Sequence, residues 1–210
     1  GYLKTITSND TNSNESIKDE YITDKGQYQI KIDNEIFQKV GVPISIHTDG
    51  DKSSFKKNDG TDLNNIPEKL ARLDSTSISF AAKIKDEKIV KLPDSEAILF
   101  NYLPTNDSRF GFPFLVNADF ITTTNRETII AENLWNVYLF YYIGYYSIQW
   151  IADTASIKIT DSSKESLRNS ILSLLPKKQT DTKEIHQLFN KGFQKGIEEI
   201  PFIPCASEKI

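Results

Sequence analysis

The segment from Ala97 to Ile151 constrains the fold of this chain more than any other. Its two apolar runs, AILFNYLP and FPFLVNADF, read as strands and are separated by the polar loop 105–111. The turn ITTTNRE follows, and the aromatic-rich stretch from Glu127 to Ile151 has the length of a long helix. A chain with this order must place a buried helix against a sheet, which favours an α+β domain.

We predict an α+β fold in which a mixed four-stranded sheet is covered on one face by two helices. The predicted strands lie near 76–84, 88–92, 97–103 and 112–120, and the covering helices span 127–151 and 163–175. A C-terminal helix is expected over 183–200, with costly glycines at Gly192 and Gly196.

The rest of the chain is organised around this predicted core. The alternating runs Tyr28-Ile30-Ile32 and Val42-Ile44-Ile46 predict a small N-terminal β element, and 66–73 predicts a short helix. We predict that the chain divides into a polar N-terminal segment with that β element (1–65), a transducer-like α/β domain (66–180), and a C-terminal helix and tail leading to a following domain (181–210).

Composition excludes several classes of function. The 210 residues carry 25 Lys and Arg against 29 Asp and Glu, a net charge of −4, so the chain lacks the basic face that nucleic acid requires. Cys205 is the only cysteine, which excludes an internal disulfide and fits a reducing, cytoplasmic compartment. The two histidines, His47 and His186, have no partner motif, and we interpret them and Cys205 as structural.

Neither a membrane partner nor a metal site is predicted. The apolar stretch Leu134–Ile151 contains Asn136, Gln149 and several tyrosines, which favour a buried helix over a membrane span. The polar loop 49–65 lacks the terminal acidic residue of a calcium loop. The first residues hold no apolar targeting segment. The chain starts with Gly and contains no Met, which predicts a piece of a longer protein.

Five short motifs in the centre of the chain occur in an order that resembles a known family. They are Leu103-Pro104, Pro113, Val116-Asn117, Asn125-Arg126 and Trp135-Asn136. In this order they resemble the sacsin-like branch of the GHKL ATPase superfamily, which includes gyrase and heat-shock chaperones. The resemblance covers about residues 66–176 and extends weakly to the tail. It implies a transducer-type middle domain, a two-layer α/β sandwich with a left-handed crossover.

The resemblance also implies what this chain lacks. The nucleotide pocket of the superfamily requires a Glu-x-x-x-Asn helix, an Asp-x-Gly-x-Gly turn and a Gly-rich lid, and this sequence has no Glu-x-x-x-Asn beside such a turn. ATP and magnesium are therefore implied for the parent protein, held by an N-terminal ATP-binding domain that would be the first partner. This chain by itself is expected to bind neither. A homodimer is a further expected partner, and the client protein stays unknown.

Arg126 is the candidate catalytic residue. In related enzymes the second domain contributes one Lys or Arg from its strand-to-helix turn, which reaches the terminal phosphate held by the first domain. Thr124-Asn125-Arg126-Glu127 occupies the matching place here. The resemblance implies that Arg126 senses this phosphate and couples it to domain closure, because phosphoryl transfer builds charge that a delivered cation stabilises. Thr124 and Asn125 are further candidates for contacts to phosphate or to the attacking water.

Plainer interpretations stay open. Residues 122–124 can cap a helix whose first turn contains Glu127, with Arg126 paired to a surface carboxylate. Arg109, on the loop 105–111, is a second candidate cation that we expect to be solvated. The chain could instead be a non-catalytic protein–protein interaction module, docking through the aromatic helix 127–151 or the C-terminal helix. We expect Trp135 to anchor the core and Asn136 to hydrogen-bond backbone in the neighbouring sheet.

Overall fold

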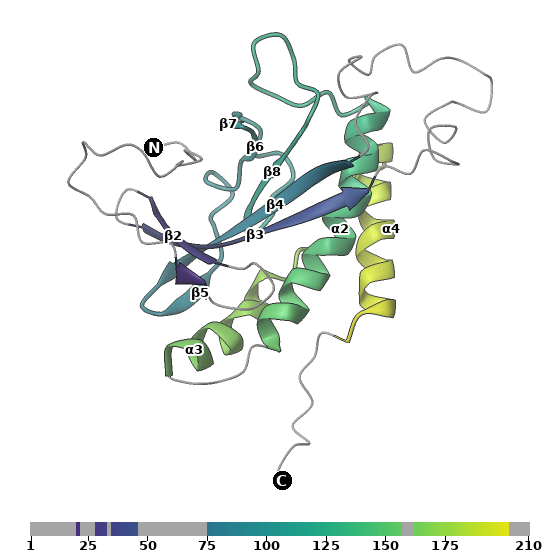
Figure 1. Cartoon of the computed structure of the whole chain (residues 1–210). Coiled ribbons are helices and arrows are strands. Elements are labelled where there is room, and N and C mark those ends of the chain that lie inside the picture. The colour runs from purple at the N-terminus through teal and green to yellow at the C-terminus, as the bar shows by residue number, and fades with distance from the viewer. Residues whose placement is uncertain (1–19, 22–27, 33–34, 46–74, 157–161, 202–210) are drawn as a thin grey trace.

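The described strands form one mixed sheet. The computed structural model describes residues 20–21, 28–32, 35–45, 75–156 and 162–201. The strand order is β1-β2-β3-β4-β8-β6-β7, and β5 pairs with β4 (Figure 1). Strands β6 and β8 are parallel, and the other pairs are antiparallel. The strands are β1 (Glu20–Tyr21), β2 (Tyr28–Ile32), β3 (Glu35–Ser45), β4 (Ser75–Lys85), β5 (Lys88–Val90), β6 (Leu99–Asn101), β7 (Leu103–Pro104) and β8 (Leu115–Ala118).

The four predicted strands all occur in this sheet, as β4, β5, β6 and β8, and the predicted α+β class with a mixed sheet is confirmed. The predicted N-terminal β element occurs as β2 and β3. Strand β3 pairs with β4 from Ile36↔Ile84 to Ser45↔Ser75, so this element continues the same sheet. The division of the chain into 1–65, 66–180 and 181–210 stays a prediction. The predicted helix 66–73, His47 and Cys205 lie outside the described residues.

The long helix begins later than predicted. It is α2 (Leu134–Ala155), not 127–151, because the side chain of Asn133 accepts the N–H of Trp135 at 2.9 Å and caps the helix there. The other helices are close to the predictions. The span 163–175 forms α3 (Ser162–Ser170) followed by a 3-10 turn, and the C-terminal helix is α4 (Glu184–Glu199).

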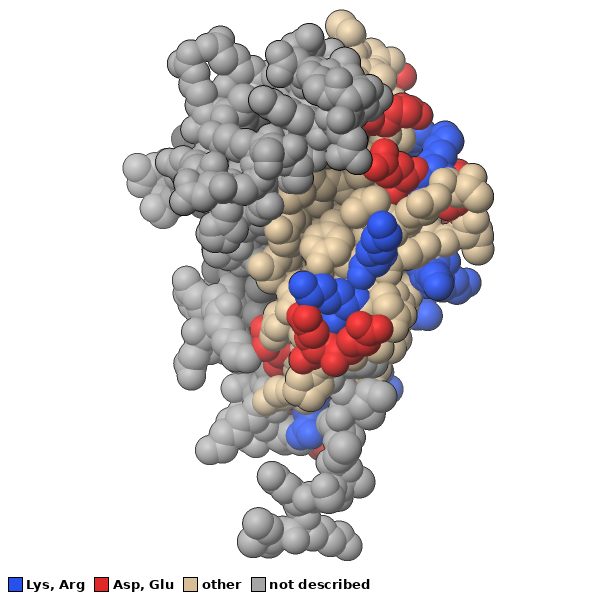
Figure 2. All heavy atoms as spheres, turned by 90° about the vertical axis from the view of Figure 1, so that its right-hand side faces the viewer, with Lys and Arg blue, Asp and Glu red and all other residues tan. Residues whose placement is uncertain are grey.

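The two longest helices differ in how much surface they leave free. No residue of α2 is exposed. The helix packs against strands of the sheet and against α4 in the main core. Helix α4 exposes one side, which carries Glu184, Lys191, Lys195, Glu198 and Glu199. Figure 2 shows the right-hand side of Figure 1, where Lys and Arg lie among Asp and Glu over the described residues. Among the described residues, this face therefore carries no large patch of positive charge and none of negative charge.

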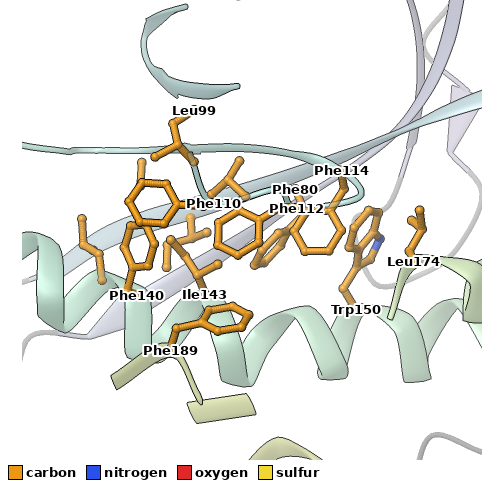
Figure 3. Packing of buried hydrophobic residues seen from close by; sticks show 14 of the residues in the cluster. Phe80, Leu99, Phe110, Phe112, Phe114, Phe140, Ile143, Trp150, Leu174 and Phe189 are labelled. Carbon is orange, nitrogen blue, oxygen red and sulfur yellow. The ribbon is translucent and has the colours of Figure 1, made fainter. Parts of the chain in front are cut away.

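Aromatic rings form the main core between the sheet and the helices (Figure 3). Residues 78, 80, 82 and 84 of β4 are all buried in this cluster, as the two-residue period of a strand requires. Phe80 stacks on Trp150 of α2 at 5.5 Å between centroids. Phe112, just before β8, contacts Phe140 of α2 at 5.9 Å and Phe189 of α4 at 5.1 Å. The segment before β8 thus touches both long helices.

The opposite face of the sheet has a smaller core. Ala81 and Leu115 point to this side and pack with Leu92, Ala97 and Phe100. No helix residue belongs to this second cluster, whereas α2, α3 and α4 all contribute to the first. The described helices therefore cover one face, and the chain around residues 92–98 covers part of the other.

Glycines let α2 and α4 approach closely. A Cβ on Gly192 would collide with the backbone carbonyl oxygen of Tyr141, and one on Gly144 would collide with that of Phe189. A Cβ on Gly196 would lie 3.0 Å from the Cβ of Ile148. The glycines that weaken α4 as an isolated helix are thus explained by contact between two backbones.

The left-handed crossover that the resemblance implies can be compared with the described strands and helices. All described helices follow β8 in sequence, and the parallel strands β6 and β8 are joined by residues 102–114 without a helix. The described part of the chain therefore contains no helical crossover between parallel strands. Within this part, no helix is both long and apolar enough to cross a membrane.

Gly192→Ala tests the helix contact. We expect the free energy of unfolding to fall, because overpacking costs about 1–3 kcal/mol and exceeds the helix-propensity gain of about 1 kcal/mol. The control is Gln194→Ala on the exposed side of α4, which should change stability little. Denaturant unfolding of both variants measures the difference, and a Gly192→Ala variant more stable than the wild type would contradict the close approach.

Candidate functional site

Arg126 lies in a tight turn between two short extended segments, and not at a helix start. Thr122 and Ile129 form an isolated antiparallel bridge at the base of this turn. Thr123 N–H donates to the carbonyl of Thr128 at 2.9 Å, and Arg126 N–H donates to that of Thr123 at 2.8 Å. The interpretation in which residues 122–124 cap a helix containing Glu127 is therefore wrong. We call residues 122–129 the Arg126 turn.

The backbone of Arg126 adopts a left-handed conformation with φ of 59°. This region is favoured by glycine and costs other L-residues about 1–2 kcal/mol. The side chains of Thr124, Asn125, Arg126 and Glu127 are all exposed. Among the described residues, no side chain pairs with the Arg126 guanidinium. The cation therefore projects from a strained turn, without the surface carboxylate that the plainer interpretation requires.

Asn125 closes the turn from within. Its Oδ1 accepts from the Thr123 hydroxyl at 2.7 Å and from Glu127 N–H at 3.3 Å, while its Nδ2 donates to the Glu127 carboxylate at 2.6 Å. An Asn side chain that bonds the backbone two residues on is typical of tight turns. Asn125 therefore shapes the turn. Of the three predicted binding residues, Thr124 and Arg126 are the ones whose side chains have no partner within the part of the chain that the structure describes.

A buried carboxylate holds the base of the Arg126 turn. The side chain of Asp107 has no exposed surface, and its Oδ2 accepts from Ile129 N–H at 3.0 Å. Arg109 donates to both oxygens of Asp107, from Nε at 2.7 Å and from Nη2 at 2.6 Å. Its Nη2 also donates to the Ile129 carbonyl at 3.2 Å. Arg109 is half exposed to solvent, as expected, but its guanidinium also joins the loop 105–111 to Ile129, an arrangement that we call the clamp.

The clamp perturbs the ionisation of Asp107. Burial acts to raise the pKa of this carboxyl. The hydrogen bonds from Arg109 and from the Ile129 N–H outweigh burial, and the pKa of Asp107 lies below its ordinary value. The same pairing raises the pKa of Arg109. Asp107 is therefore a carboxylate at neutral pH, and its buried charge is compensated on two sides.

Residues of the sequence motifs bond the backbone that carries the turn. Asn136, fully buried on α2, accepts from Ile121 N–H at 2.9 Å and donates to the carbonyls of Ile121 and Ile130 at 2.7 and 2.9 Å. Trp135 Nε1 donates to the carbonyl of Asp119 at 2.7 Å. The expectation for Trp135 is confirmed, since it is buried in the core. Asn136 bonds backbone, but that of Ile121 and Ile130, which lie outside the strands of the sheet.

A second strained residue lies at the ends of β6 and β8. Tyr102 has φ of 60° and an exposed fraction of 71%. Its N–H donates to Oδ1 of Asn117, another motif residue, at 3.0 Å. A hydrogen bond to Asp119 raises the pKa of the Tyr102 hydroxyl, and Asp119 also accepts from Thr76 at 2.7 Å. This arrangement interrupts the predicted strand 97–103 and separates β6 from β7.

Sequence reasoning missed Asp107 and Asp119. The signal for Asp107 was an acidic and a basic residue two apart, Asp107 and Arg109, between two apolar strands. Such a pair is common on exposed loops, so nothing local distinguishes a buried one. Among the described residues, no group of three or more His, Cys, Asp or Glu side chains could hold a metal ion.

Comparison with known proteins adds no assignment. The chain matches no model of a known protein family, no curated protein and no solved structure.

Arg109→Ala should destabilise the protein. Removing one partner of a buried ion pair typically costs about 3–5 kcal/mol, and we expect about 2–3 kcal/mol here because the guanidinium is half exposed. The matched control is Arg126→Ala, which removes a free arginine from the neighbouring loop. Equal stability of the Arg109→Ala and Arg126→Ala variants in denaturant unfolding would contradict the clamp.

Asp107→Asn should change how stability depends on pH. The folded pKa of Asp107 lies below the unfolded value of about 3.9, so the ionised carboxylate stabilises the fold above that pH and this contribution is lost as pH falls through the folded pKa. The stability gap between wild type and Asp107→Asn should therefore be largest near neutrality and shrink in acid. Unfolding curves from neutral to acidic pH measure it, and a gap independent of pH would count against an ionised Asp107.

Proposed function

We propose that this chain is a middle, transducer-type domain of a sacsin-like GHKL ATPase, and that Arg126 contacts the terminal phosphate of ATP held by a separate N-terminal domain. One observation carries the proposal. Arg126 is exposed on a braced turn and, among the described residues, has no side-chain partner. An arginine that contacts a ligand on another domain needs an unpaired guanidinium and a backbone held in a fixed position.

The bracing of the turn supports this role physically. An exposed arginine on a mobile loop would lose entropy when it met the phosphate, whereas one on a fixed turn is already placed. Asp107 fixes Ile129 at one end of the turn, and Asn136 fixes Ile121 and Ile130 around it. The guanidinium provides a fixed charge and forked donors, which match phosphate oxygens.

The proposed mechanism assigns one task to each residue of the turn. Arg126 stabilises charge on the equatorial oxygens of the transferred phosphoryl group when the two domains close. Thr124 offers a hydroxyl beside it, and Asn125 holds the turn through Thr123 and Glu127. The parent protein, proposed to be a cytoplasmic chaperone-like ATPase, would bind the ATP and magnesium in its N-terminal domain.

The alternative of an interaction module finds less support from the helices. Helix α2 has no exposed residue, so it offers little surface to a partner. The exposed side of α4 carries mixed charges and no apolar stripe among the described residues.

Arg126→Gly separates the functional from the structural role of this residue. Glycine suits the left-handed backbone, so we expect stability to be unchanged or raised by about 1 kcal/mol or less. In the full-length parent protein we expect ATP turnover to fall by about a thousandfold with unchanged ATP affinity.

Two further variants complete this experiment. Arg126→Lys keeps the charge and should retain part of the turnover, and Lys191→Ala on exposed α4 should retain all of it. Unchanged turnover in Arg126→Gly would refute the phosphate contact. A large loss of stability in that variant would show instead that Arg126 has a structural partner.

A further inference from the structure

A polar hollow of about 360 Å³ lies between the loop 105–111 and the start of α4. The buried Phe110 and Ala131 form its apolar part. Its polar lining includes Arg109, Gln179, Asp181, Lys183 and His186. A hollow of this size can enclose a small metabolite. Its lining contains no residue of the Arg126 turn, although Arg109 both lines the hollow and bonds Ile129 at the base of that turn.

Gln179 determines which nitrogen of His186 carries the proton. The Gln179 Nε2 donates to the carbonyl of Phe110 at 3.0 Å, so its Oε1 faces His186 Nδ1 at 3.2 Å and can only accept. Asn190 bonds both the backbone N–H and the carbonyl of Gln179 at 2.8 Å, which fixes the residue in place. The neutral imidazole therefore has its proton on Nδ1, and its Nε2 presents a lone pair.

Asp181 places a second acceptor beside this lone pair. Its Oδ2 lies 3.6 Å from His186 Nε2, while its Oδ1 accepts from Lys183 N–H at 3.0 Å. Burial lowers the pKa of His186, and the nearby charges of Lys183 and Arg109 lower it further against the opposing effect of Asp181. Near neutral pH two acceptors thus face each other. Among the described residues, no side chain donates to either, so a positively charged donor placed between them would bond both.

The same hollow also presents cations. Arg109 uses Nε and Nη2 for Asp107, which leaves Nη1 without a partner among the described residues. Lys183 also lines the hollow and is exposed. Arg109 and Lys183 supply two cations, and three carboxylates act on them: Asp107 and Glu132 on Arg109, and Asp181 beside Lys183. A simple anion would meet Asp181 and a simple cation would meet Lys183, whereas a neutral molecule with separated charges satisfies both.

We propose that this hollow binds a small zwitterion of the amino-acid type. Its ammonium group donates to His186 Nε2 and Asp181 Oδ2, and its carboxylate accepts from Lys183 and from Arg109 Nη1. The apolar stem between the two charged groups lies against Phe110 and Ala131.

The test is an amide NMR titration of this chain with probes of matched size. Glycine, γ-aminobutyrate and 6-aminohexanoate vary the separation of the two charges, and butyrate and n-butylammonium each carry one. We expect one zwitterion to shift the signals of Arg109 and of residues 179–186. It should bind at least about tenfold more tightly than either singly charged probe, because each charged end contributes charge-assisted hydrogen bonds.

Variants localise this binding. Asp181→Asn keeps an acceptor for Lys183 N–H, so the start of α4 should fold, and zwitterion affinity should fall about tenfold or more. Arg126→Gly is the matched control and should bind normally. No shift with any zwitterion at tens of millimolar would overturn the proposal, as would equal binding of butyrate or butylammonium. Unchanged binding by Asp181→Asn would overturn it too.

The imidazole provides a check that needs no ligand. Long-range nitrogen–proton spectra should show the neutral His186 ring protonated on Nδ1. The only other histidine is His47, and a His186→Gln variant assigns the signals. A neutral ring protonated on Nε2 would remove the paired acceptors and overturn the proposal.

Discussion

The candidate site depends on one buried charge, the carboxylate of Asp107. An uncompensated carboxylate in a protein interior is strongly unfavourable, so the chain around it must supply donors. Arg109 supplies a bidentate pair from the same loop, and Ile129 supplies its backbone N–H from the far side of the Arg126 turn. These hydrogen bonds fix the position of the loop 105–111 relative to the Arg126 turn. The Arg126 turn is exposed, but its position in the fold is therefore fixed.

The same loop links the turn to the helical layer. Phe110 contacts Phe140 of α2 at 4.4 Å and His186 of α4 at 5.3 Å. The carbonyl of Phe110 also accepts from Gln179, which Asn190 of α4 holds. Arg109 consequently belongs to both environments, with its Nε and Nη2 on the clamp and its other side lining the polar hollow. One short segment thus brings the turn, the core and the start of α4 together.

The regular elements could be predicted because their signals are local. The two-residue period of β4 and the length of the apolar stretch in α2 each appear in the sequence itself. The start of α2 was misplaced because residues 127–133 continue the apolar pattern without forming a helix. Two local features pointed to the later start. Ile129 and Ile130 are β-branched and favour extended structure, and Asn133 is a strong N-cap residue.

The candidate residues could be named from the sequence, but their contacts could not. The order of motifs singled out Arg126, Asn117, Trp135 and Asn136, which all lie in the segment 117–136 of the sequence. The polar side chains of Asn117 and Asn136 bond backbone, so these residues position the chain. Asp107 contacts Ile129 across 22 residues of sequence, and no spacing rule reveals a contact of that kind. The tautomer of His186 likewise depends on Gln179, seven residues away, and through it on Phe110, which is distant in sequence.

Amide hydrogen exchange at Ile129 tests the central claim, that Asp107 fixes the Arg126 turn, most directly. Ile129 is buried and its N–H bonds only the Asp107 carboxylate among the described residues. We expect this amide to exchange nearly as slowly as the core amides of β4 and α2, and much faster in an Asp107→Asn variant whose α2 amides stay protected. Exchange at Ile129 as fast as that of an exposed loop amide in the wild type would show that the turn opens freely, and would contradict the account.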